Sequence, residues 1–197
     1  MIRRDGVRGD RKRRNEKDDA LRSGEPGTVV AEGQTPGLFA GLGQTLTRGV
    51  VAGLFAGLLF LVSQMGWAVE NLDKPALAPM LDMSTIFTRD EVPAATPGSV
   101  VIGLVTHLNL SMLFGIGFSM LVVPLARNTM LLVLGGLGYG LLLYVLNIQI
   151  LGRLAFEWFT NPNGPPQVAE IFFHAEFGLL LVPFFIGAAQ RVRAVAA

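Results

Sequence analysis

The sequence predicts an all-α integral membrane protein with four transmembrane helices. Hydrophobic residues make up 51% of its 197 residues, which is high for a soluble domain of this length. Four apolar stretches are each long enough to cross about 30 Å of hydrocarbon, a distance that takes roughly 20 helical residues. They are rich in Leu, Gly and Phe without the strict alternation of barrel strands, which favours helices. We predict spans near residues 49–68, 99–125, 129–151 and 168–189.

The chain divides into a charged N-terminal tail, residues 1–34, and a four-helix transmembrane domain, residues 35–197. Nine of the sixteen Lys and Arg residues lie in the tail, mixed with acidic residues, and this composition predicts a disordered cytoplasmic segment. Such a tail can contact nucleic acid or anionic lipid, but the mixed charge favours a solvated tail, and nucleic acid is not an expected partner. The absence of Cys excludes disulfides and sites that need a thiolate.

The distribution of basic residues predicts which side of the membrane each end of the spans faces. With both termini in the cytoplasm, thirteen Lys and Arg residues fall on that side, and only Lys74, Arg89 and Arg153 fall outside. Positive charge favours the cytoplasmic side, so we predict an N-in, C-in topology. The expected location is a bacterial inner membrane. An outer loop, residues 67–98, then joins the first two spans, and its length indicates a function or some structure of its own. Within it, residues 82–87 are expected to form a short surface helix.

Two pairs of spans share residue spacings that predict an internal repeat. In the first and third spans, two glycines and a carboxamide stand four and seven residues apart, which keeps them on one helix face. These residues are Gly53, Gly57 and Gln64 in the first span and Gly136, Gly140 and Asn147 in the third. The second and fourth spans both carry Phe-Gly, preceded by His107 and Ser111 in one and by Glu170 and His174 in the other. The matches indicate two parallel-repeated helical hairpins, although ordinary small residues at helix contacts would explain the glycines equally well.

Five polar residues of the predicted spans are expected to lie together in the outer third of the membrane. They are Gln64, His107, Asn147, Glu170 and His174. Ionisable side chains within a span are unfavourable in hydrocarbon, so they mark a candidate functional site. Glu170 and His174 stand four residues apart on one helix face, close enough for the carboxylate to accept a hydrogen bond from the imidazole. The sequence therefore predicts a polar chamber lined by all four helices.

Glu176 does not belong to this predicted chamber. It lies about 200° around the last helix from His174, at the usual 100° per residue. An isolated carboxylate within a span is unfavourable, so we expect Glu176 to be protonated or to pair with another helix or subunit. It is a candidate contact with a partner.

Several ligands suit the predicted chamber. His107 and His174 have the chemistry of the two axial ligands of haem b. Together with Glu170 they have the chemistry of a copper, zinc or iron site. A quinone headgroup, a lipid or another small molecule could instead accept and donate hydrogen bonds there. In the alternative structural role, both histidines are neutral and hold helices together through Asn147, Gln64 or backbone carbonyls.

Enzymatic motifs are absent from the sequence. It contains no nucleophile elbow, phosphate-binding loop or paired-His metalloprotease motif, so an enzyme is not the favoured interpretation.

Two motifs in the second half of the chain carry a resemblance to known sequences. The runs GLGYGLLLYVLN, from Gly136 to Asn147, and HAEFG, from His174 to Gly178, resemble small uncharacterised bacterial membrane proteins. Those proteins have a glycine-rich helix ending in Asn and a later His followed by Phe-Gly. The resemblance covers the last three helices and implies a four-helix protein with no assigned activity.

The function predicted from these features is a non-enzymatic accessory or scaffolding subunit of a larger membrane assembly. The small number of spans, the long tail and Glu176 favour it, and they imply a membrane-protein partner or a second copy of the chain. The alternative is a module that binds haem, a metal or a quinone through His107 and His174.

Overall fold

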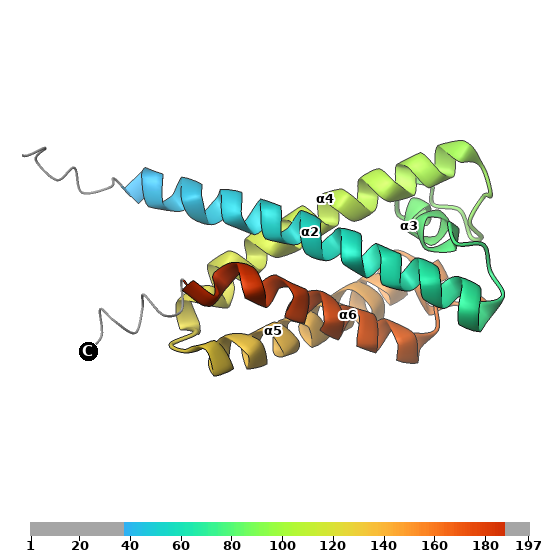
Figure 1. Ribbon diagram of the computed structural model, residues 1–197. Coiled ribbons are helices and arrows are strands. Elements are labelled where there is room, and N and C mark those ends of the chain that lie inside the picture. The colour runs from blue at the N-terminus through green and yellow to red at the C-terminus, as the bar shows by residue number, and fades with distance from the viewer. Residues whose placement is uncertain (1–37, 188–197) are drawn as a thin grey trace, which may run out of the picture. The chain divides into compact units, whose positions relative to one another are not determined.

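The computed structural model describes residues 38–187, and these residues form helices without any β-strand. The predicted disordered tail, residues 1–34, lies outside the described residues. The long helices are α2 (Leu38–Leu72), α4 (Pro97–Leu121), α5 (Thr129–Tyr144) and α6 (Gln167–Leu181), shown in Figure 1. The short elements are the α-helix α3 (Ala78–Thr88), the 3₁₀ helices η1 (Val123–Leu125), η3 (Glu157–Thr160) and η4 (Val182–Phe185), and the π-helix η2 (Val145–Gly152).

Four helical segments are long and apolar enough to cross a membrane, as the sequence predicts. They are Gly41–Leu72, Pro97–Leu125, Thr129–Gly152 and Gln167–Phe185. The first helix begins before the predicted span, at Leu38, and it continues beyond Trp67 to Leu72. The prediction of an all-helical fold with four helices of this length and composition is confirmed.

Side-chain caps and prolines set the starts of two of these helices. Thr96 accepts a hydrogen bond from the backbone N–H of Ser99 at 3.1 Å, and Pro97 occupies the first turn of α4. Asn128 caps α5 in the same way through the N–H of Leu131, at 2.9 Å. Because Asn128 follows η1 within three residues, α4 and α5 are joined by a tight turn.

Glycines bring the backbones of the long helices into contact in pairs, with α2 against α4 and α5 against α6 (Figure 1). A Cβ atom added at Gly53 of α2 would overlap the carbonyl oxygen of Ser111 in α4. A Cβ atom at Gly140 of α5 would likewise overlap the carbonyl oxygen of His174 in α6. Only glycine permits such close approach, and this is why small residues are frequent where membrane helices pack.

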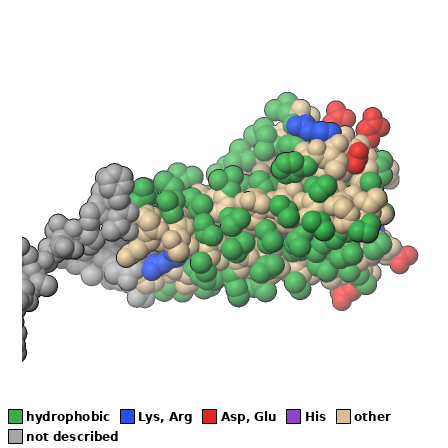
Figure 2. Space-filling model, turned by 90° about the horizontal axis from the view of Figure 1, so that it is seen from above, with side chains coloured by type: hydrophobic (Ala, Val, Ile, Leu, Met, Phe, Trp, Pro, Cys, Tyr) green, Lys and Arg blue, Asp and Glu red, His purple; other side chains and the backbone are tan. Residues whose placement is uncertain are grey.

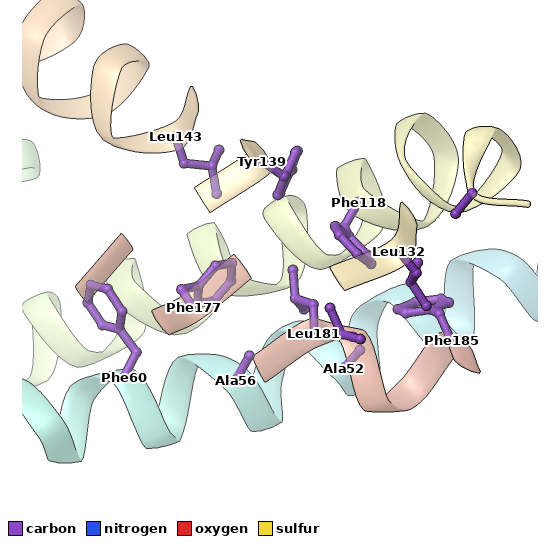
Figure 3. Packing of buried hydrophobic residues seen from close by; sticks show 12 residues of the cluster. Ala52, Ala56, Phe60, Phe118, Leu132, Tyr139, Leu143, Phe177, Leu181 and Phe185 are labelled. Atoms are coloured by element: carbon purple, nitrogen blue, oxygen red, sulfur yellow. The ribbon is translucent and has the colours of Figure 1, made fainter. Parts of the chain in front are cut away.

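The interior between these pairs is filled mainly by aromatic and branched side chains. Figure 3 shows Phe60 and Ala56 of α2 facing Phe177 and Leu181 of α6. Further along the bundle, Phe118 of α4 packs against residues from α5 and η4, namely Tyr139 and Phe185, with ring centroids 5.5 Å and 5.4 Å away.

The predicted outer loop, residues 67–98, contains α3, which is longer than the predicted surface helix at 82–87. It packs against the first half of α4, where a Cβ atom at Gly103 would overlap the carbonyl oxygen of Met80. Acidic side chains gather at the end of the molecule that carries α3, whereas the long side of the bundle is mostly hydrophobic (Figure 2). The loop therefore covers one end of the four-helix bundle.

Candidate ligand-binding cavity

A cavity of about 240 Å³ lies within the bundle at the end covered by α3. Side chains from α2, α4, α5, η2 and α6 line it, together with residues of α3 and of the segment between η2 and α6. Its walls are mostly apolar, and the aromatic residues Phe60, Phe114, Phe173 and Phe177 contribute much of them. All five polar residues predicted to form a chamber line this one cavity: Gln64, His107, Asn147, Glu170 and His174.

His107 is held by the packing of α4 against α2. Its Nε2 lies 2.8 Å from the carbonyl oxygen of Gly57, and Ser111 Oγ donates to the carbonyl of His107 at 2.7 Å. Because a carbonyl oxygen can only accept, Nε2 carries the proton and Nδ1 keeps its lone pair. Nδ1 has no hydrogen-bond partner in residues 38–187. Every side-chain nitrogen and oxygen that is fully buried in this part of the chain does have a partner. Nδ1 is therefore not fully buried, and it borders open space. The sequence identified His107 but could not identify the carbonyl that orients it.

His174 is oriented by its own helix. Its Nδ1 lies 2.8 Å from the carbonyl oxygen of Glu170 and 3.5 Å from the carboxylate Oε2 of the same residue. The proton is therefore on Nδ1, and the lone pair is on Nε2. Nε2 has no partner in the described part of the chain, and it borders open space by the same argument as His107 Nδ1.

Glu170 connects α6 to α2 at the cavity wall. Gln64 Nε2 donates to Glu170 Oε1 at 2.9 Å. Since the amide nitrogen faces the carboxyl group, Gln64 Oε1 remains available as an acceptor. The bond pairs two of the predicted residues with each other.

Phe60 of α2 contacts both histidines. Its ring stacks on His107 with centroids 5.5 Å apart, and it meets His174 edge-on at 5.7 Å. The two imidazoles thus share one aromatic neighbour, which occupies space beside both of them.

Asn147 lies in the π-helix η2, which replaces the last turns of the third span. Its side chain lines the cavity and has no hydrogen-bond partner among residues 38–187. Single π-turns within α-helices often occur at functional sites, because they change the direction in which side chains project. Nothing in the sequence predicted this departure from α-helix.

Two charged residues of the outer loop, Asp82 and Lys74, also line the cavity, and sequence reasoning missed both. Trp158 Nε1 donates to Asp82 Oδ1 at 2.8 Å, which ties α3 to η3. Burial raises the pKa of Asp82 above its usual range, and the Trp158 hydrogen bond and the charge of Lys74 oppose this rise in part. No spacing rule could have revealed these residues, because the loop reaches the cavity only through the fold.

A second polar cluster adjoins the cavity beside His174. Gln149 Nε2 donates to Tyr144 Oη at 2.6 Å and to Gln167 Oε1 at 2.8 Å, and Gln167 Nε2 donates to the carbonyl of Phe159 at 2.7 Å. The Tyr144 ring meets His174 with centroids 5.9 Å apart. The cluster joins η2, η3 and the start of α6, and it was not predicted.

Glu176 does not line the cavity. Its Oε1 accepts a hydrogen bond from Ser63 Oγ of α2 at 2.7 Å. The carboxyl group that was expected to pair with another helix or subunit therefore has a partner within its own chain.

No known protein-family model, curated protein or solved structure matches the chain.

Proposed function

We propose that this protein binds a small, largely apolar molecule with a polar headgroup inside its membrane-spanning bundle. One observation carries the proposal: five polar side chains that are far apart in the sequence line a single, mostly apolar cavity. Cavities of this composition, with a few polar groups at fixed positions, are typical of small-molecule sites.

The polar groups of the cavity favour binding over a purely structural role. The hydrogen bonds from His107 to Gly57 and from Gln64 to Glu170 do hold helices together, as the structural alternative requires. Each histidine nevertheless uses only one ring nitrogen in this way, so one nitrogen of each ring remains for a ligand.

The residues present do not fit haem b or a transition metal. Nε2 of His107 bonds to a backbone carbonyl, and the Phe60 ring occupies space beside both imidazoles, stacked on His107 and edge-on to His174. Within residues 38–187, no three His, Asp or Glu side chains come together as a metal-ligand set. We therefore place the quinone, lipid or small-molecule alternative ahead of the metal and haem alternatives.

A scaffolding role in a larger membrane assembly, with a partner protein or a second copy of the chain, is the weaker candidate. One of the three features that favour it is the carboxyl group of Glu176, and this group accepts a hydrogen bond from Ser63 of the same chain. The size of the complex extracted in mild detergent tests it, and a monomer without any partner would contradict it.

We also propose the N-in, C-in topology, the two-hairpin repeat and a bacterial inner membrane location. The exposed residues at the end with α3 include Glu70, Asp73, Asp90 and Glu91, whereas Arg127 lies at the turn between α4 and α5. This charge distribution supports a cytoplasmic α4–α5 turn. The protein has no Cys, so labelling a single cysteine introduced at Asp90 in intact cells tests the topology, and protection from an impermeant reagent would contradict it.

Equivalent contacts support the repeat. Gly53 meets Gly115 in the α2–α4 pair, and Gly136 meets Gly178 in the α5–α6 pair, as the sequence alignment of the two halves requires. Superposition of the two halves in an experimental structure tests this symmetry, and different helix crossing angles would contradict it.

The bacterial location rests on the resemblance of the last three helices, and detection of the protein in isolated inner membranes tests it.

The binding function is tested by filling the cavity. The protein is purified in mild detergent, its bound small molecules are extracted with solvent, and they are quantified by mass spectrometry. We expect one apolar compound near equimolar amounts in the wild-type protein and its loss in Asn147→Trp, because the larger side chain occupies the cavity.

The matched control is Asn109→Trp, at an exposed position of α4 that does not line the cavity. It makes the same chemical change, and it should retain the compound. Equal amounts of the compound in Asn147→Trp and wild type, or no compound in the wild type, would contradict the proposed function.

A further inference from the structure

We propose that the cavity selects an apolar phenol or hydroquinone, which it binds through aromatic hydroxyl groups that donate hydrogen bonds. This inference rests on the proposed binding function and names the chemical class of the ligand. The class of ligand follows from the hydrogen bonds that the cavity residues already make within the protein. Only polar atoms that these bonds leave free can form hydrogen bonds with a ligand.

The two histidines present acceptors rather than donors to the cavity. In each ring the protonated nitrogen donates to a backbone carbonyl, of Gly57 for His107 and of Glu170 for His174. An uncharged imidazole has one donor and one acceptor, so the nitrogen that is left over is an acceptor in both cases. The imidazolium form would add a charge within a membrane span, which is unfavourable.

Gln64 adds a third acceptor. Its amide nitrogen donates to Glu170 Oε1 at 2.9 Å. The amide oxygen of Gln64 can then accept a hydrogen bond from a ligand.

The other donors that line the cavity are the hydroxyl of Ser111, the ammonium group of Lys74, the indole N–H of Trp67 at an exposed position of α2, and the amide of Asn147. The hydroxyl of Ser111 donates to the carbonyl of His107, and the ammonium group of Lys74 donates to the carbonyl of Asn163 at 3.3 Å. Asn147 is the one lining side chain described here whose amide is wholly unused, and it can donate as well as accept. The nitrogens that the two histidines leave free are therefore both acceptors, and a ligand with hydroxyl groups satisfies them where a carbonyl compound does not.

The apolar walls suit a planar ring. Phe60 makes edge-on contacts with Phe173 and Phe177, both at 6.0 Å between centroids, and His107 stacks on Phe60 itself. Aromatic rings favour these edge-on and stacked arrangements with one another, so an aromatic ligand gains contacts that an aliphatic alcohol lacks.

The test compares two compounds with the same carbon skeleton, a hydroquinone with two hydroxyl donors and a benzoquinone with two carbonyl acceptors. The full-length protein in phosphatidylcholine nanodiscs is titrated with decylhydroquinone, kept reduced, and separately with decylbenzoquinone. Ligand bound to empty nanodiscs is subtracted to remove partitioning into lipid. We expect the hydroquinone to bind at least about tenfold more tightly, because the benzoquinone leaves buried acceptors unpaired.

The histidine variants then test whether His174 causes the preference for the hydroquinone. His174→Leu should abolish the preference for hydroquinone, whereas His174→Gln, which keeps a donor and an acceptor, should retain much of it. Asn109→Ala is the control outside the cavity and should behave as wild type.

The possible results separate the two proposals. Equal binding of both compounds, or tighter binding of the benzoquinone, would overturn the hydroxyl selectivity and leave the binding function intact. Binding of neither compound above empty nanodiscs would overturn both. The binding of the two compounds to the wild-type protein tests the hydroxyl selectivity even if a histidine variant fails to fold.

Discussion

At the level of single residues, backbone carbonyls decide what the two histidines can do. The sequence singled out His107, His174 and Glu170 because ionisable side chains are rare in apolar spans. It could not reveal which ring nitrogen is occupied, since the carbonyl of Gly57 reaches His107 only because α2 and α4 pack closely. It also left Glu176 without a partner, because the position of Ser63 relative to α6 depends on how the helices are rotated.

Asp82 offers a prediction at this scale. Burial raises its pKa in the folded protein, so folding favours the protonated form. That contribution to stability is complete below the ordinary Asp pKa of about 3.9 and is lost as the pH rises through the raised pKa of the folded state. Asp82→Asn cannot ionise and keeps an oxygen for Trp158, so it should gain stability relative to wild type as the pH rises from about 4 to 7.

Melting temperatures in detergent at several pH values measure this difference. Asp82→Leu is the comparison variant, because it also removes the charge but leaves the indole N–H of Trp158 unpaired, which costs about 1–3 kcal/mol. If the difference in melting temperature between Asp82→Asn and wild type does not change with pH, Asp82 does not titrate as its burial implies.

At the level of elements, span length and composition were predictable, whereas local irregularities were not. Apolar length predicts a spanning helix because the bilayer fixes the length that must be covered. The π-helix η2 gives no such signal, since it depends on contacts with η3 and on the network around Gln149. The extent of α3 was likewise underestimated, because its packing against Gly103 of α4 is a tertiary contact.

Two glycines of α5 test the close contact between α5 and α6. Gly140→Ala places a Cβ atom against the carbonyl oxygen of His174, and should destabilise the protein by about 1–3 kcal/mol because the helices must separate. Gly138→Ala makes the same change two residues away, where no atom lies within 4 Å of the new Cβ, and should be neutral or stabilising by up to about 1 kcal/mol.

Thermal or denaturant unfolding in a single detergent measures both variants. Equal effects of the two substitutions would mean that helix propensity, and not the contact between α5 and α6, determines the result.

At the level of the whole molecule, four helices, α3, η2 and η3 together line one cavity. The residues that line it come from almost the entire described chain, from Phe60 to Phe177. The sequence predicted its polar part, because those residues lie at similar depths in four apolar spans. It did not predict the outer part, where Asp82 and Lys74 line the cavity from a loop whose path no periodicity reveals.

The most direct test of the cavity as a binding site is photoaffinity labelling with competition. A decylphenol that carries a diazirine is added to the protein in nanodiscs and photolysed, with and without an excess of untagged decylphenol, and the labelled residues are mapped by mass spectrometry. The cavity predicts competed labelling at lining residues such as Phe60, Leu110 and Phe173. Labelling that the untagged compound does not reduce, or that is confined to exposed positions such as Val101 and Leu59, would contradict a binding site inside the bundle.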